Sequence, residues 1–402
     1  MKVLVLSWEF PPRIVGGISR HVAELYPELV KLGAEITVAT VEAPPAPALE
    51  TVDGLAVHRL AIEPNPHFFG WIENLNRRLV QWGEAQAPIS FQVIHAHDWL
   101  VADAAIALQA RWELPLVATI HATEFGRYNG IYSDAQRHVH HKELQLAAKA
   151  DRVIVCSEYM AQEVGRALNC PREKVRVIPN GLSLARVNAH RPPPDFEREA
   201  FRRQFAEPNE ALVYYVGRIS HEKGIFVLLE AAPRILAACQ NRVKFVAIGS
   251  GETHTHFLKQ RAAHLGITER VLFTGFMSDP EVAKFQAVAD CAVFPSLYEP
   301  FGIVALESFA AGVPVVVSST GGLPEVVRHE ETGLIARVND GPALAEAIVR
   351  ILQDRDLAQR LVANAQHDLH TRFNWQRIAP QTLQVYQELV GVGAATGYIK
   401  GC

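Results

Sequence analysis

Short apolar runs alternate with amphipathic helical patterns along almost the whole chain, and this alternation restricts the fold more than any other feature. In the first half, the predicted strands lie at 2–7, 35–41, 55–60, 92–96, 115–120, 152–156 and 175–178. Continuous apolar runs of this length are typical of parallel strands that helices cover on both faces. The sequence therefore predicts an α/β fold.

A second series of runs follows the proline-rich segment Arg191-Pro192-Pro193-Pro194-Asp195, where we place a linker because proline removes backbone donors. The later predicted strands lie at 212–216, 243–248, 271–276, 291–294, 313–318 and 334–338. A chain of 402 residues also exceeds the size of one hydrophobic core, about 250–300 residues. We expect two doubly wound, Rossmann-like domains, 1–190 and 191–375, facing each other across a cleft.

Two amphipathic helical patterns do not follow from the alternation of strands and helices, and their packing is predicted separately. The pattern at 376–390 follows the second sheet, and its apolar face is predicted to return to the first domain. The pattern at 67–86 carries five apolar residues on one face: Phe68, Ile72, Leu75, Leu79 and Trp82. This face favours packing against the first domain, and peripheral docking on a membrane is the alternative.

Composition excludes several classes of protein. A formal net charge of −4 provides no general attraction for nucleic acid. The five cysteines are scattered and lack the spacing of a zinc site, which indicates a reducing compartment. The apolar run at 2–7 is too short for a signal peptide or a membrane span. We expect a cytoplasmic protein, with the inner face of the cell membrane as the place of any peripheral contact.

Candidate binding residues follow predicted strands, where parallel sheets bind anions. Gly16 and Gly17 precede the first helix, and their amides can approach a phosphate or a sugar, although a plain tight turn is equally consistent. Arg218 and Lys223 follow the strand at 212–216 and can reach one diphosphate. The alternative for these cations is a solvated loop.

The segment from Glu299 to Glu307 joins the strand at 291–294 to a helix. With a helix start near Phe301, Glu307 lies about two turns into the helix and can accept hydrogen bonds from ribose hydroxyls. Glu299 and the amides of Phe301, Gly302 and Ile303 can meet a sugar. A capping acid and a solvated acid are the alternative for the two carboxylates.

These residues resemble the signature of retaining glycosyltransferases of family GT4, which have the GT-B fold. The resemblance covers nearly the whole chain and includes these segments: His95-Ala96-His97-Asp98-Trp99, Thr119-Ile120-His121, Ile178-Pro179-Asn180-Gly181 and Thr320-Gly321-Gly322-Leu323-Pro324-Glu325. Asp98 and Trp99, on the acceptor side, look like those of bacterial and archaeal glycogen synthases.

The resemblance implies a role for each candidate. Arg218 and Lys223 would hold the diphosphate, Glu307 the ribose and Glu299 a sugar hydroxyl. His121 would contact the donor sugar near the reacting carbon. Without its neighbours, His121 is more typical of a buried histidine that donates to a backbone carbonyl at a strand end.

The predicted reaction is transfer of a hexosyl group, glucose in the first instance, from UDP-glucose to a saccharide acceptor in polysaccharide or glycoconjugate biosynthesis. Ile14 stands where glycogen synthases commonly carry lysine, which disfavours ADP-glucose. The alternatives left open are ADP-glucose-dependent α-glucan elongation, a nucleotide-sugar hydrolase or epimerase, and a noncatalytic binding protein.

We predict no cofactor, because the nucleotide sugar is a substrate, and no catalytic metal. The histidines at 138, 140 and 141 lie on a predicted helix whose spacing does not bring three ligands together. The leaving diphosphate would instead be neutralised by cationic side chains and helix N-termini. A dinucleotide dehydrogenase is disfavoured because His254 replaces the third glycine of the G-x-G-x-x-G motif.

Overall fold

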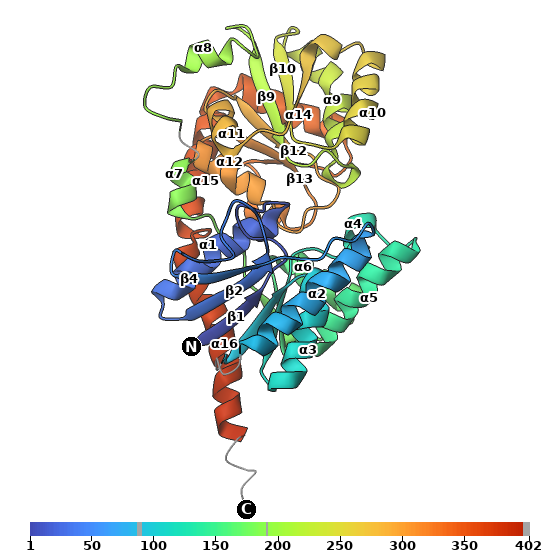
Figure 1. Ribbon diagram of the computed structural model, residues 1–402. Coiled ribbons are helices and arrows are strands. Elements are labelled where there is room, and N and C mark those ends of the chain that lie inside the picture. Colours follow the sequence, from blue (N-terminus) through green and yellow to red (C-terminus); the bar gives the residue numbers. More distant parts are fainter. Residues whose placement is uncertain (87–90, 190–191, 397–402) are drawn as a thin grey trace, which may run out of the picture. The chain divides into compact units, whose positions relative to one another are not determined.

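The computed structural model describes residues 1–86, 91–189 and 192–396, and the chain divides into two compact units (Figure 1). Unit 1 comprises Met1–Asn180 and the C-terminal segment that begins at Trp375, and unit 2 comprises Gly181–Asn374. The boundary precedes the proline segment at 191–195, of which residue 191 lies outside the described residues. It comes earlier because helix α7, Leu184–Ala189, already packs on two helices of unit 2, α11, Asp279–Gln286, and α12, Ile303–Ala311.

Unit 1 is built on a sheet with the strand order β3-β4-β2-β1-β5-β6-β7-β8. Its strands are β1 Lys2–Leu6, β2 Glu35–Val41, β3 Leu49–Val52, β4 Leu55–Leu60, β5 Val93–His97, β6 Leu116–Ile120, β7 Arg152–Val155 and β8 Val175–Val177. All pairs are parallel except β3 with β4. Every strand predicted in this half is therefore present.

Strand β3 is the element that the sequence did not predict. It forms a hairpin with β4 through Asp53 and Gly54, which have φ angles of 49° and 84°. Positive φ angles at both central residues are typical of the turns that connect two-residue hairpins. The strand itself lies at the edge of the sheet and is partly exposed, so it lacks the apolar run that marks the other strands.

Helices form two layers in unit 1. The helices are α1 Gly17–Lys31, α2 Phe68–Ala85, α3 Ala102–Trp112, α4 Glu124–Tyr128, α5 Asp134–Lys149, α6 Glu158–Leu168 and α16 Trp375–Thr396. Helices α1 and α16 pack together, and residues of both share a core with β1, β2 and β4. Helices α2, α3 and α5 pack in series as another layer.

The two amphipathic patterns have definite places in unit 1. Helix α16 is longer than the predicted range 376–390, and it buries Trp375, Ile378 and Tyr386 in the core shared with α1. Helix α2 buries the apolar residues of its predicted face, from Ile72 to Trp82, whereas Phe68 is 52% exposed. The face considered for membrane docking is thus largely packed inside unit 1.

Unit 2 contains a parallel sheet with the order β11-β10-β9-β12-β13-β14. Its strands are β9 Ala211–Val216, β10 Val243–Ile248, β11 Val271–Gly275, β12 Cys291–Phe294, β13 Val315–Ser318 and β14 Leu334–Ala336. All six were predicted. The order reverses between β9 and β12, and ligands of open α/β sheets bind at such a point, beyond the carboxyl ends of the strands.

The helices of unit 2 are α7 Leu184–Ala189, α8 Arg198–Arg202, α9 Ile225–Ala238, α10 Glu252–His264, α11 Asp279–Gln286, α12 Ile303–Ala311, α13 Leu323–Val326, α14 Gly341–Gln353 and α15 Arg355–Thr371. Helix α12 packs against β12, β13 and α15, which fixes the loop that precedes it. None of the helices in the described part of the chain has the length and apolarity needed to cross a membrane.

Candidate active site

Three loops of unit 2 meet at one edge of its sheet. They follow β9, β12 and β13, which are neighbours in the sheet, and they carry the predicted donor-site residues. The amides of Leu297 and Tyr298 donate to the carbonyl of Glu222 at 2.8 and 3.1 Å, and the amide of Gly322 donates to the carbonyl of Glu299 at 2.9 Å. The loops therefore form one connected platform.

Glycine allows this close approach at two positions. A Cβ on Gly321 would lie 1.8 Å from the carbonyl oxygen of Glu299, and one on Gly224 would lie 2.0 Å from that of Pro295. The φ angles, 56° and 64°, also belong to the left-handed region that other residues rarely adopt. The predicted Thr320-Gly321-Gly322 segment thus supports the Glu299 loop by direct backbone packing.

The platform pairs two of the predicted residues directly. The Lys223 ammonium lies 2.7 Å from Oε2 of Glu299, and their side chains are only 21% and 11% exposed. Arg218 lies on the same loop as Lys223, but its side chain is 58% exposed and donates to Oε1 of Glu222 at 3.2 Å. One cation is therefore held in place by the platform, and the other extends into solvent.

Glu307 has a partner that the sequence did not reveal. Its buried carboxylate accepts a hydrogen bond from the Arg186 guanidinium at 2.8 Å, and Arg186 also lies 3.5 Å from Asp279. Because α12 begins at Ile303, Glu307 stands about one turn into the helix, not two. Nothing around Arg186 in the sequence marks it, since it lies far from the motif that contains Glu307.

The segment between the two carboxylates forms the start of α12. Phe301 is buried against Phe373, and Gly302 has a φ angle of 107° at the N-cap position. Gly302 has no side chain to cap the first amides of α12. The predicted amides at Gly302 and Ile303 therefore belong to a helix N-terminus, which attracts anions.

In unit 1, the glycine pair stands at the start of α1 and is tied to the loop that follows β1. Oε2 of Glu9 accepts hydrogen bonds from the amides of Val15 and Gly16 at 2.6 and 2.9 Å. The amide of Gly16 is therefore engaged within the unit, and Gly17 is the first residue of the helix. Arg13, beside the same turn, places its guanidinium over the rings of Trp8 and Trp71.

The end of β5 positions the predicted acceptor-side residues. Asp98 has a φ angle of 58°, and its Oδ1 accepts a hydrogen bond from the amide of His121 at 2.7 Å. Burial raises the pKa of Asp98 to about 7, although that hydrogen bond acts in the opposite direction. Trp99 is half-buried beside the rings of Phe68 and Phe69. Asp98 thus joins the ends of β5 and β6.

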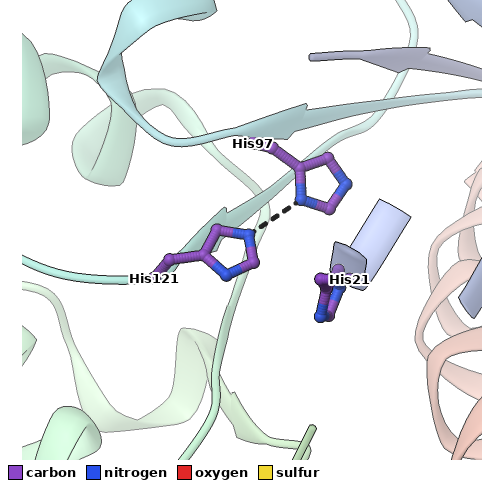
Figure 2. A group of neighbouring side chains, drawn as sticks. All are labelled: His21, His97 and His121. Atoms are coloured by element: carbon purple, nitrogen blue, oxygen red, sulfur yellow. Dashed lines mark hydrogen bonds between the residues drawn. The ribbon is translucent and has the colours of Figure 1, made fainter. Parts of the chain in front are cut away.

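His121 belongs to a group of three histidines (Figure 2). Nδ1 of His97 lies 3.0 Å from Nε2 of His121, and His21 of α1 stands beside this pair with Nδ1 2.8 Å from Oδ1 of Asn180. Burial lowers the pKa of His21 to about 4 and those of His97 and His121 well below the ordinary value. All three imidazoles are therefore neutral at pH 7.

A buried hydrogen-bonded chain supports these histidines. The Tyr26 hydroxyl lies 2.7 Å from Nε2 of His97 and 2.8 Å from Nδ1 of His95. His95 in turn contacts the hydroxyls of Tyr386 and Thr119 at 2.6 and 2.7 Å. The motif around His95 signalled the region, but the contacts with α1 and α16 were not predictable from it.

The histidines considered for metal binding at the outset lie elsewhere. His138, His140 and His141 are all on α5, where His140 lies near Glu143. In the described part of the chain, the group whose ligand atoms approach one another is His21, His97 and His121. The sequence did not reveal it, because its members come from α1, β5 and the residue after β6.

Comparison with known proteins identifies the family. The model described as Glycosyltransferase Family 4 matches residues 15–186, and the one described as Glycosyl transferases group 1 matches residues 197–368. A glycosyltransferase of Methanocaldococcus jannaschii, described as uncharacterized, is 36% identical over 96% of this chain and 98% of its own length. The chain belongs to the family 4 glycosyltransferases. The resemblance drawn from its motifs is thereby confirmed.

Further relatives of this glycosyltransferase have named activities. Glycogen synthase of Mycobacterium tuberculosis is 35% identical over 96% of this chain and 94% of its own. Among solved structures, sucrose-phosphate synthase from Thermosynechococcus elongatus is 26% identical, with a TM-score of 0.82 over 97% of this chain and 99% of its own. The similarity to this solved structure confirms the predicted GT-B fold class.

Proposed function

We propose that this glycosyltransferase transfers a glucosyl group from a nucleotide diphosphate, UDP in the first instance, to a hydroxyl of a saccharide acceptor. The anomeric configuration of the sugar would be retained. The observation that carries the proposal is the Lys223–Glu299 ion pair, with Arg218 on the same loop, at the carboxyl edge of the unit 2 sheet. Cations at this edge suit a diphosphate.

The cations would act on the leaving group. As the bond between the anomeric carbon and the phosphate oxygen breaks, negative charge grows on the diphosphate and positive charge on the sugar ring. Fixed cations that face the developing charge lower this barrier. Lys223, held by Glu299, would supply the fixed charge, and the exposed Arg218 would close on the diphosphate when the donor binds.

Carboxylates would hold the rest of the donor. Glu299 can accept a hydrogen bond from a sugar hydroxyl while it keeps Lys223 in place, since a carboxylate has about four acceptor positions. Glu307 would accept from ribose, with Arg186 fixing its orientation. The N-terminus of α12, from Gly302 to Ile303, would meet the sugar or the phosphate.

We assign His121 of unit 1 to a hydroxyl of the donor sugar near the reacting carbon. The ring is neutral, so one nitrogen can donate and the other accept. Retention would follow from attack on the face that the phosphate leaves. The acceptor oxygen bonds to the anomeric carbon, the phosphate oxygen departs, and the acceptor proton passes to that oxygen.

ADP-glucose-dependent elongation of an α-glucan is the second candidate. It is favoured by the similarity to glycogen synthase at 35% identity over nearly the whole chain. Against it stands Ile14, which is 53% exposed at the position where those synthases commonly carry lysine. The neighbouring cation, Arg13, lies over Trp8 and Trp71.

A donor screen tests the proposal. The full chain is heated with UDP-glucose, ADP-glucose or GDP-glucose, and the donor that raises the unfolding temperature is incubated with oligosaccharide acceptors. We expect UDP-glucose to stabilise the protein most and the NMR spectrum of the product to show a retained anomeric configuration. Preference for ADP-glucose would favour the second candidate. Inversion of configuration, or free sugar as the main product with every acceptor, would contradict glycosyl transfer with retention.

A further inference from the structure

We propose that His21, His97 and His121 form a binding site for a divalent transition-metal ion of the zinc class. One nitrogen from each ring lies within 4.8 Å of the other two, and Figure 2 shows His21 beside the hydrogen-bonded pair of His97 and His121. Two nitrogens bound to one tetrahedral zinc ion at about 2.0–2.1 Å lie about 3.4 Å apart. Nδ1 of His97 and Nε2 of His121 are already 3.0 Å apart, so small ring rotations suffice.

His21 provides independent evidence of a ligand. Its Nδ1 is engaged with Asn180, and its Nε2 is buried without a hydrogen-bond partner among the described residues. Because Oδ1 of Asn180 can only accept a hydrogen bond, Nδ1 carries the ring proton and donates it, and Nε2 carries a lone pair. A buried acceptor atom without a protein partner is available to a ligand. Nε2 is the atom that a metal ion would bind.

The ring nitrogens of His21 and His97 that would not bind the metal have the oxygen contacts expected at a metal site. Metal-binding imidazoles usually engage their second nitrogen with an oxygen, which fixes the tautomer and the ring orientation. Oδ1 of Asn180 does so for His21 at 2.8 Å, and the Tyr26 hydroxyl does so for His97 at 2.7 Å.

Three histidines would leave a fourth coordination position open, and the occupied site would inhibit the enzyme. This consequence rests on the proposed function, in which His121 contacts the donor sugar. An ion bound to His121 would occupy the space beside this ring, where the sugar hydroxyl is proposed to bind. Inhibition is consistent with the expectation that catalysis requires no metal, because the ion acts only by blocking the site.

Metal binding is measured first, without reference to activity. The full chain, stripped with EDTA and dialysed, is titrated with Zn²⁺ by calorimetry and with Co²⁺ by visible absorption. We expect one equivalent of either ion to bind, with intense Co²⁺ bands typical of a tetrahedral site. Absence of a one-equivalent binding event would overturn the proposal.

Two variants show where the ion binds. Asn at position 21 places its amide nitrogen close to the former Nδ1 and removes Nε2, so His21→Asn preserves a donor for Asn180. We expect this variant to bind Zn²⁺ at least about tenfold more weakly. His141→Asn, at an exposed histidine on α5, should bind like the wild type. Wild-type affinity in His21→Asn, with an unchanged unfolding temperature in EDTA, would contradict the site.

Activity is then followed with increasing Zn²⁺. We expect the wild type and His141→Asn to lose glucosyl transfer as the site fills and to recover on addition of EDTA. His21→Asn should require at least about tenfold more Zn²⁺. Binding without loss of activity would overturn the inhibitory role and leave the metal site in place. If no donor is turned over at all, the proposed function fails, and the binding measurements still decide the site.

Discussion

The Lys223 ammonium lies 2.7 Å from Oε2 of Glu299, although 76 positions separate the two residues in the chain. Their loops follow β9 and β12, which are neighbours in the sheet. The pair is mostly buried, so each charge compensates the other in the absence of a substrate. We infer that Glu299 keeps Lys223 in position before the donor arrives.

This coupling predicts a non-additive effect of mutation. Lys223→Ala should lower kcat about 10- to 150-fold, because a charge-assisted contact to the leaving group contributes about 1.5–3 kcal/mol. Glu299→Gln should also lower kcat, and the double variant should lose less than the product of the two effects. Steady-state kinetics of the three variants measure the coupling. Lys259→Ala, at an exposed lysine on α10, serves as the control and should retain wild-type rates. Strictly multiplicative losses would show that the two residues act independently.

A second prediction concerns Arg186 and Glu307. Arg186→Leu leaves the buried carboxylate of Glu307 without this guanidinium, and breaking one partner of a buried ion pair costs about 3 kcal/mol or more. Urea unfolding of the variant should therefore show a markedly lower free energy of unfolding. The double variant Arg186→Leu, Glu307→Leu should recover part of the loss. An Arg186→Leu protein as stable as the wild type would mean that other groups compensate Glu307.

The raised pKa of the buried Glu143 predicts that the stability of the protein depends on pH. Burial raises the pKa of Glu143 in the folded protein to about 8, whereas its ordinary value is 4.5. Between these values the unfolded chain ionises the group and the folded protein does not. Stability therefore falls as pH rises from 4.5 to 8, by at most about 1.4 kcal/mol per pH unit.

Glu143→Gln tests this linkage because glutamine does not titrate. We expect urea unfolding at pH 9 to show the variant to be more stable than the wild type, with the difference shrinking towards pH 4.5. Glu73→Gln, at an exposed position on α2, should show no such trend. A difference between Glu143→Gln and the wild type that is equal at both pH values would exclude a titrating Glu143.

The expectation that no metal takes part in catalysis is tested with EDTA. Neutralisation of the leaving diphosphate by Arg218, Lys223 and the N-terminus of α12 should leave glucosyl transfer at its full rate after exhaustive chelation. Initial rates are compared before and after dialysis against EDTA. A rate that falls and returns only with Mg²⁺ or Mn²⁺ would show that a metal ion performs this task.

The sequence predicted the strands well because parallel strands that are covered on both faces consist of continuous apolar runs. It did not predict β3, whose exposed edge position removes that signal. The unit boundary was placed too late, because the prolines follow α7 and α7 already packs in unit 2. Local patterns thus specify elements, whereas contacts between elements decide where a unit ends.

The site was predictable to the extent that its residues lie in contiguous motifs. Glu299, Phe301 and Glu307 share one segment. The partners that fix the site come from remote positions: Arg186 lies 121 residues from Glu307, and Asn180 lies 159 residues from His21. Such contacts arise only when the sheets assemble, so no spacing in the sequence reveals them.

The binding position of the donor tests the central claim most directly. A crystal structure of this glycosyltransferase with UDP should show the pyrophosphate within hydrogen-bond distance, about 2.7–3.2 Å, of Lys223 and Arg218. The ribose hydroxyls should lie against Glu307 in the same structure. A pyrophosphate bound away from both cations would contradict the donor site and the mechanism built on it.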